Sequence, residues 1–157
     1  MGRCALKAWE HGVEAYRRSA NPPPGVTTGH LLLGVLKEDA CAGGLILTKM
    51  QLDLKLAYAV TEFVLLHSRH QVASDQEPVV DWGGVPHSLA ARTVLDLAVE
   101  EANLFSSTYP IGTEHLLLAL LRVPNGMGYR VLQYFGIEVD KARATRDELW
   151  ELLRSPE

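Results

Sequence analysis

The feature that most constrains this chain is a motif that occurs twice, first from residue 28 and again from residue 113. Residues 28–37 read Thr-Gly-His-Leu-Leu-Leu-Gly-Val-Leu-Lys, and residues 113–122 read Thr-Glu-His-Leu-Leu-Leu-Ala-Leu-Leu-Arg. Weaker similarities at the same offset follow, with 45–47 matching 130–132 and 52–55 matching 137–140. Since ordinary solenoid repeats have shorter periods, the pattern indicates a tandem duplication of one unit of about 70 residues.

The first copy carries four helical signals and almost no strand signal. We expect helices over about 3–18, 28–37, 42–50 and 53–67. Three prolines at 22–24 end the first helix, whose cap is either missing or Met1, and Thr27 or Thr28 caps the second. The side chains expected to be buried on the first and fourth helices are Leu6, Trp9, Val13, Tyr16, Leu56, Val60, Phe63 and Val64.

The second copy follows the same plan. Ser88 caps its first helix, Thr113 caps its second, Gly136 stops its third, and the last helix covers about 140–153. The side chains expected to be buried are Ala91, Val94, Leu95, Ala98, Ala102, Phe105, Ala142, Leu149, Leu152 and Leu153. Between the copies, residues 71–86 have the composition of a linker, although Val79, Val80 and Trp82 are expected to dock. The prediction is a single all-α domain, 1–157, with eight helices, repeat one at 1–70 and repeat two at 87–157.

Composition narrows the class of protein. With 157 residues, of which 47% are hydrophobic, the chain can bury a core as one domain. A net charge of -4 and scattered Lys and Arg argue against a nucleic-acid binder. Neither a signal peptide nor an apolar run long enough to span a bilayer is present. Cys4 and Cys41 lie far apart and are predicted to form neither a disulfide framework nor a metal site, which suits a reducing cytoplasm. We therefore expect a soluble cytoplasmic protein.

The common signatures of catalysis are absent from the sequence. It contains no phosphate-binding G-x-x-x-x-G-K-[ST] loop, no G-x-S-x-G nucleophile and no zinc-binding H-E-x-x-H. His67 and His70 have a spacing that could hold a metal, but solvated histidines at a helix end are the favoured interpretation. The prediction is a protein that is not an enzyme and has no cofactor or metal.

Four kinds of side chain remain as candidates for a site. His30 and His115 sit just inside two capped helices, where packing with one ring nitrogen bonded to a nearby loop is favoured over a base or ligand role. Glu114 lies in a first helical turn, which favours a carboxylate, yet Gly29 at the matching place shows that such a helix start does not require one. Trp82 and Tyr129 are candidates for exposed contact surface.

The paired motifs resemble the hallmark of a known family. Thr28-Gly29-His30-Leu31-Leu32-Leu33-Gly34 and Ile111-Gly112-Thr113-Glu114-His115-Leu116-Leu117-Leu118 are similar to the repeats of the Clp N-terminal domain, found at the front of ClpA- and ClpC-type AAA+ unfoldases. Residues 136–143 resemble the start of the last helix of that repeat, and 100–102 the end of its first helix. The resemblance covers nearly the whole chain and implies eight helices in two pseudo-symmetric four-helix repeats.

What the resemblance implies is docking of proteins rather than catalysis. The family module recruits adaptors and substrates, and in ClpC-type members the Glu of each Gly-Thr-Glu-His motif helps to recognise phosphorylated arginine. Carried over to this chain, the phosphoarginine or substrate site consists of Glu114, Thr113 and Ser88. The counterpart at Thr28 and Gly29 is degenerate because Gly29 replaces the Glu, so we expect at most one such site.

Two other interpretations stay open at this point. One is a small metal-binding protein or enzyme that uses His30, His115 and Glu114 across the pseudo-twofold axis. The other is a structural accessory subunit of a Clp protease, held through an apolar groove between the repeats. For the favoured interpretation the expected partners are adaptor or substrate proteins and a ClpC-type unfoldase or Clp protease, with no nucleic acid and no membrane, and the domain itself is expected to be a monomer.

Overall fold

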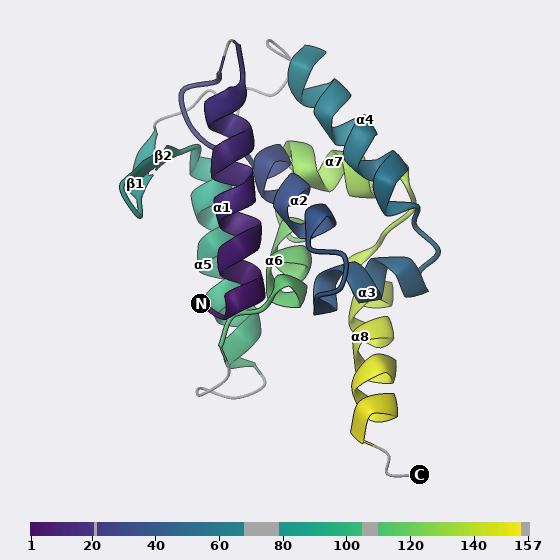
Figure 1. The fold of residues 1–157 in the computed structure, drawn as a ribbon. Helices are drawn as coiled ribbons and strands as arrows, with labels where there is room; N and C mark the ends of the chain where they lie inside the picture. The colour runs from purple at the N-terminus through teal and green to yellow at the C-terminus, as the bar shows by residue number, and fades with distance from the viewer. Residues whose placement is uncertain (21, 68–78, 105–109, 155–157) are drawn as a thin grey trace.

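Helices dominate the computed structural model, which describes residues 1–20, 22–67, 79–104 and 110–154. The first four helices are α1 (Arg3–Arg18), α2 (Thr28–Lys37), α3 (Ala42–Lys49) and α4 (Leu54–His67). A short hairpin follows, β1 (Val80–Trp82) and β2 (Val85–His87). The last four helices are α5 (Leu89–Asn103), α6 (Thr113–Leu120), α7 (Met127–Tyr134) and α8 (Val139–Arg154). The predicted all-α class with eight helices is confirmed over these residues (Figure 1).

The duplication seen in the sequence is also present in the backbone. The starts of α2 and α6, of α3 and α7, and of α4 and α8 are all separated by the same offset as the two leucine motifs. The two turns that end α3 and α7 agree as well, since Gln51 and Gly136 both have a positive φ, 65° and 76°. The chain is therefore two copies of one four-helix unit, with the same helix starts and the same turn after the third helix.

The two leucine motifs form the centre of the core. Leu31 to Leu33 on α2 and Leu116 to Leu118 on α6 are all buried, because these two helices are surrounded on every side by the others (Figure 1). Helix α1 comes close to α2, since a Cβ at Gly34 would overlap the carbonyl of Ala8. A glycine at position 34 is what allows the two backbones to approach this closely.

The two repeats are held together by a reciprocal pair of hydrogen bonds. The backbone N–H of Gly43 on α3 donates to Oγ1 of Thr113 on α6, at 2.8 Å. At the matching positions of the other repeat, the N–H of Gly128 on α7 donates to Oγ1 of Thr28 on α2, at 3.0 Å. Each third helix thus has one of its unpaired N-terminal donors satisfied by the other repeat. The third helix of each repeat therefore depends on the other repeat for this hydrogen bond.

The hairpin lies in the stretch that the sequence predicted as a linker. Gly83 and Gly84 both have a positive φ, 62° and 78°, which a two-residue turn between antiparallel strands requires. Trp82 packs edge-on against Trp9 and is half-buried, so the prediction that it forms exposed contact surface is wrong. His87 fixes the second strand: its Nδ1–H donates to the carbonyl of Val85 at 2.8 Å, and its Nε2 accepts from the indole N–H of Trp9 at 3.0 Å.

The structure contradicts the prediction that the two cysteines form no disulfide. Cys4 at the start of α1 and Cys41 at the N-cap of α3 form a disulfide bond, with their Cα atoms 6.2 Å apart. They are 37 positions apart in the chain, but the fold brings the start of α3 next to the start of α1. The sequence could not show this proximity, and the cysteine content no longer argues for a reducing compartment.

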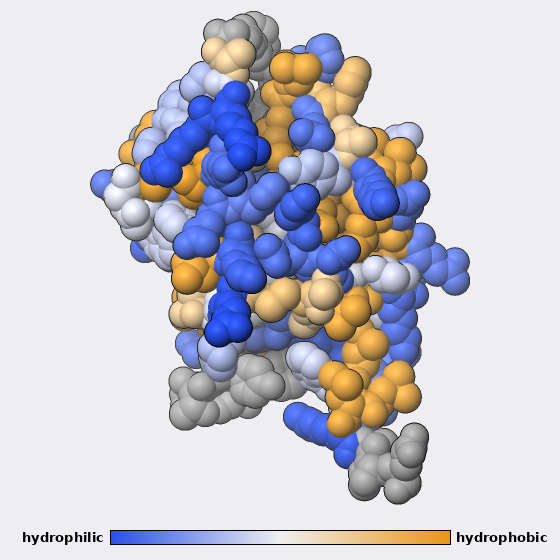
Figure 2. All heavy atoms as spheres, viewed as in Figure 1, coloured by the Kyte–Doolittle hydropathy of each residue, from blue (hydrophilic) through white to orange (hydrophobic). Residues whose placement is uncertain are grey.

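Several side chains predicted to be buried on the outer helices are exposed. Leu56 and Phe63 on α4 are exposed, Phe63 by 62%, and so are Leu6 on α1 and Leu152 and Leu153 on α8. Helix α4 is apolar on two faces, and its buried face carries Ala57 and Thr61 instead. Phe105, also predicted to be buried, lies outside the described residues. Figure 2 shows the resulting apolar surface over α4 and over the end of α8. Even so, no helix among the described residues is long and apolar enough to cross a membrane.

Candidate functional site

The start of α6 holds two of the predicted site residues side by side. Gly112 is the N-cap, and Thr113 and Glu114 occupy the first turn. Thr113 is buried and its hydroxyl already accepts the hydrogen bond from Gly43, so it contributes to packing between the repeats. Glu114 is the side chain at this helix start whose chemistry has no such structural use.

Glu114 is a buried carboxylate at the start of α6. Its exposed fraction is 5%, and the carboxylate folds back over Gly112, at the place where a Cβ on that residue would lie. Among the described residues the polar partner of its carboxylate is Nε2 of His115, 3.7 Å from Oε1, which is longer than a hydrogen bond. The N-terminal turn of α6 favours the negative charge. A carboxylate in this position has unused capacity to accept hydrogen bonds from a ligand.

Both candidate histidines serve as helix caps. Nδ1 of His115 accepts from the N–H of Gly112 at 2.8 Å, and Nδ1 of His30 accepts from the N–H of Thr27 at 3.0 Å. Each ring therefore plays the part that Glu or Gln plays in a capping box. Burial lowers the pKa of His30 to about 4, and burial also lowers the pKa of His115, although the carboxylate of Glu114 opposes that shift. Both rings are neutral at pH 7, and the packing interpretation is confirmed.

The structure gives no support for a metal centre. Within the described ranges, no three His, Cys, Asp or Glu side chains gather closely enough to hold a metal ion. His67 packs its ring against Phe63, while its predicted partner His70 lies outside the described residues. Since His30 and His115 each have a ring nitrogen committed to a cap, the arrangement favours neither of the metal interpretations.

Ser88 is not part of the same site as Glu114. It is the N-cap of α5, where its Oγ accepts from the N–H of Ala91 at 3.1 Å, and its own N–H donates to the carbonyl of Val26 at 2.8 Å. The start of α5 therefore lies beside the start of α2, and the rest of α5 separates it from the α6 start (Figure 1). A helix of 15 residues is about 22 Å long.

The start of α1 takes the corresponding place beside Glu114. The N–H of Gly2, which is the N-cap of α1, donates to the carbonyl of Ile111 at 2.8 Å. The cap is therefore Gly2 rather than Met1, and it provides no capping side chain. Each second helix begins next to the first helix of the other repeat. One such place holds the carboxylate of Glu114 without a capping hydroxyl, and the other holds the hydroxyl of Ser88 without a carboxylate.

In the first repeat Gly29 occupies the position that corresponds to Glu114, and other side chains fill the space beside it. A Cβ at this position would lie 2.8 Å from Sδ of Met127 on α7 and 2.9 Å from Cδ2 of Leu65 on α4. The neighbouring Thr28 is buried, and its hydroxyl accepts from Gly128. A glutamate at position 29 would have to displace both apolar side chains.

Sequence reasoning missed a buried ion cluster in the second repeat. Glu101 is fully buried, and its Oε1 accepts from Arg122 at 2.9 Å and from Arg143 at 2.6 Å. Its other oxygen, Oε2, has no hydrogen-bond partner within the part of the chain that the structure describes. The signal was available, because Glu101 falls on the same helix face as the buried Ala98 and Ala102.

Comparisons with known proteins agree with this architecture. Residues 88–155 match the family model of the Clp repeat (R) N-terminal domain. The chain is 32% identical over 119 residues, 76% of its length, to the ATP-dependent Clp protease ATP-binding subunit ClpA homolog of Cyanidium caldarium. It is 28% identical over 132 residues, 84% of its length, to the ATP-dependent Clp protease ATP-binding subunit ClpC of Staphylococcus saprophyticus.

The fold has a solved counterpart that covers nearly the whole chain. The N-terminal domain of the caseinolytic protease associated chaperone ClpD from Arabidopsis thaliana superposes with a TM-score of 0.70, over 96% of this chain and 94% of that one, at 22% identity. The matched segment is only 13% of the length of the Cyanidium relative and 14% of the Staphylococcus relative. The predicted resemblance is confirmed, and the chain belongs to the family of Clp N-terminal domains.

Proposed function

We propose that the chain is a non-catalytic docking module that binds adaptor or substrate proteins for a Clp-type unfoldase. The support is the match to the Clp repeat family and the relatives named as ATP-binding subunits of Clp proteases. The two histidines of the enzyme interpretation have structural roles instead, since His30 and His115 each cap a helix. What the second repeat retains is a carboxylate for recognition, Glu114.

The ligand class that suits Glu114 is phosphorylated arginine on a partner protein. A carboxylate pairs with a guanidinium group through two parallel N–H···O bonds. The start of α1 lies beside the same segment through the bond from Gly2 to Ile111, and a helix N-terminus favours a phosphate. In this proposal the side chain of Glu114 holds the guanidinium group and the first turn of α1 receives the phosphate. Thr113 supports the site by fixing α3 against α6.

The observation that carries this proposal is the environment of the Glu114 carboxylate. It is buried at a helix start, and His115 at 3.7 Å is its polar partner among the described residues. A buried charge costs free energy, so it is retained more readily where a ligand pairs with it. The filled position at Gly29 supports one site per chain rather than two.

Calorimetric titration with free phosphoarginine tests the proposal. We expect saturable binding of about one equivalent, with plain arginine and phosphoserine each at least tenfold weaker because each lacks one of the two recognised groups. Glu114→Gln keeps the shape of the side chain and removes its charge, so it should abolish the binding. Glu10→Gln removes an exposed carboxylate from α1 and serves as the control that leaves affinity unchanged. No saturable binding, or equal binding by Glu114→Gln, would overturn the phosphoarginine assignment.

A further inference from the structure

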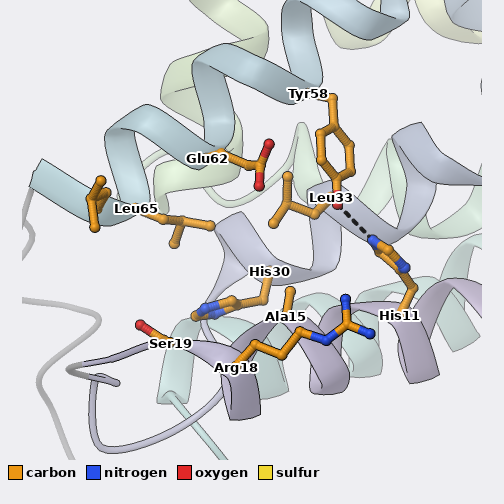
Figure 3. A pocket seen from close by; sticks show the side chains of 10 residues that line it. His11, Ala15, Arg18, Ser19, His30, Leu33, Tyr58, Glu62 and Leu65 are labelled. Carbon is orange, nitrogen blue, oxygen red and sulfur yellow. Dashed lines mark hydrogen bonds between the residues drawn. The ribbon is translucent and has the colours of Figure 1, made fainter.

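A pocket in the first repeat has no role in the function proposed above. It has a volume of about 230 Å³ and lies between α1, α2 and α4 (Figure 3). Helix α2 contributes His30 and Leu33, α1 contributes Ala15, and α4 contributes Tyr58. The Glu114 segment does not line it.

The imidazole of His30 gives this pocket a hydrogen-bond donor. Because Nδ1 accepts from the backbone of Thr27, the ring hydrogen is on Nε2. The side chain is 3% exposed, its ring is held edge-on by Tyr16, and no described residue accepts a hydrogen bond from Nε2. Nε2–H lines the pocket as a hydrogen-bond donor, so a group that presents an oxygen there is favoured.

The polar groups around the pocket have opposite charges on opposite walls. Arg18 and Ser19 come from the end of α1: Ser19 lies near the His30 ring, the Arg18 guanidinium extends along the same wall toward His11, and Glu62 lies across the pocket on α4 (Figure 3). Arg18 also pairs with Glu14, one turn earlier on its own helix. An anionic oxygen suits the side with Arg18, Ser19 and His30, whereas an N–H donor suits the side with Glu62.

The rest of the lining is apolar and small in extent. Leu33, Leu65 and Leu66 line the pocket, and Leu66 is exposed beside its opening. The volume is below the roughly 300–1,000 Å³ of pockets that hold drug-sized ligands, so it suits one amino-acid residue. An amino acid that packs on these leucines and accepts hydrogen bonds from the donors has an apolar side chain and a free carboxylate.

The second repeat has no equivalent set of groups. At the matching positions of that repeat, the pocket residues Arg18, Ser19 and Tyr58 are replaced by Asn103, Leu104 and Arg143. Tyr16, which packs on His30, is replaced by Glu101. There the carboxylate of Glu101 bonds Arg143 directly, so charged side chains satisfy one another. In the first repeat the corresponding groups are neutral, and Tyr58 bonds His11 at 2.8 Å instead.

From this geometry we infer that the first-repeat pocket binds the C-terminal residue of a peptide that ends in an apolar amino acid. The α-carboxylate accepts from Nε2–H of His30, the hydroxyl of Ser19 and the guanidinium of Arg18. The backbone N–H of the same residue faces Glu62, and its side chain packs on Leu33 and Leu65. Residues earlier in the peptide extend past Leu66. This site is separate from Glu114 and recognises a chain end rather than a phosphorylated side chain.

Nuclear magnetic resonance titration with N-acetyl-leucine tests the inference. A ligand of this size is expected to bind with a Kd of about a millimolar. Chemical-shift changes should saturate and concentrate at Ala15, Ser19, His30 and Leu66. N-acetyl-leucine amide, which has no carboxylate, should bind at least tenfold more weakly. Saturation by neither compound, equal affinity for both, or shifts centred on the second repeat would overturn the inference.

Three variants separate specific binding from general effects. Arg18→Gln should weaken binding about tenfold, while the control Arg17→Gln, which removes the same charge from the next position outside the pocket, should leave it within twofold. Ala15→Leu fills the space and should abolish binding without disturbing the caps. Equal effects of Arg17→Gln and Arg18→Gln, or unchanged binding by Ala15→Leu, would contradict the assigned pocket. Glu114→Gln is expected to have no effect, which keeps this test independent of phosphoarginine binding.

Discussion

The two repeats share a backbone plan but differ in the side chains that occupy the space between their first, second and fourth helices. In the first repeat His11 is bonded to Tyr58, Tyr16 packs on His30, and the space contains an open pocket with Arg18 and Glu62 on its walls. In the second repeat Glu101 is clamped there by Arg122 and Arg143.

The starts of α2 and α6 also differ between the two repeats. The start of α6 presents the buried carboxylate of Glu114, whereas the start of α2 has Gly29 covered by Met127 and Leu65. Residues at helix caps and in the leucine motifs are alike in the two repeats because both copies need them to fold. The differences lie where folding does not require a particular side chain, and these are the places at which we propose separate binding roles for the repeats.

The largest effect is expected from the buried ion cluster, which exists only in the second repeat. Glu101→Ala removes the buried carboxylate that Arg122 and Arg143 share and opens a cavity, which should cost about 3–5 kcal/mol of unfolding free energy. Glu100→Ala removes an exposed carboxylate that pairs with the same Arg122, and it should cost less than about 1 kcal/mol. Urea unfolding measures both, and similar costs for the two variants would contradict a specific role of Glu101.

A second difference is the disulfide, which the first repeat has and the second lacks, because Leu89 and Gly126 stand at the positions that match Cys4 and Cys41. Closing a loop of this length stabilises the folded state by about 3–4 kcal/mol. The double variant Cys4→Ser, Cys41→Ser should lower stability by that amount. A reducing agent should destabilise the native protein and leave the double variant unchanged. A reductant effect on the double variant would show that another process is responsible.

The two capping histidines offer a comparison through pH. Because the pKa of His30 is lowered to about 4 in the folded state, the unfolded state binds more protons between that value and about 6.5. The stabilisation that comes from neutral His30 is complete above about pH 6.5 and is lost as the pH falls to about 4. The free energy of unfolding should change by about 3 kcal/mol over this range. His115 should shift less, since Glu114 opposes the effect of burial.

Histidine titration by nuclear magnetic resonance and urea unfolding at several pH values check this expectation. His30→Gln keeps an acceptor at the third helical position and cannot be protonated, so its stability should fall less over the same pH range. A His30 ring that titrates near pH 6.5 in the folded protein would refute the capping account.

The smallest effect is expected at the turns after the third helices. Gln51 adopts a left-handed conformation that its counterpart, Gly136, adopts without strain. Gln51→Gly should stabilise the protein by about 0.5–1 kcal/mol, and Gly136→Gln should destabilise it by a similar amount, since open space surrounds that position. Thermal unfolding of the pair, measured side by side, checks whether the turns are equivalent. Shifts of the same sign would show that they are not.

The sequence predicted those features that depend on local pattern. The leucine motifs, the proline stop after α1 and Gly136 all mark helix boundaries. The constant offset between the two copies predicted that each helix of one repeat corresponds to a helix of the other. The hairpin at 80–87 was missed, although Gly83-Gly84 is a recognised turn signal, because a short strand pair carries little periodicity. The exposed side chains of Leu56, Phe63 and Leu153 were misjudged because helices with apolar residues on two faces do not reveal which face packs.

The sequence named candidate site residues, but it did not show which of them lie together in space. Glu114 and the absence of a carboxylate at Gly29 were evident from the motif alone. The cross-repeat arrangement was not, because hydrogen bonds such as Gly2 to Ile111 and Ser88 to Val26 join segments far apart in the chain. The same is true of the disulfide and of the Glu101 cluster, whose partners come from separate helices. Only tertiary packing reveals these pairs.

The measurement that tests the central claim most directly is a nuclear magnetic resonance titration with phosphoarginine that follows both helix starts in one sample. The account predicts saturating shifts at residues 112–115 on α6 and at residues 2–4 on α1, with residues 27–30 unmoved. Equal shifts at the two helix starts, or shifts centred on Ser88 and Gly29, would contradict the claim that the repeats have taken separate roles and that Glu114 carries recognition of the phosphorylated side chain.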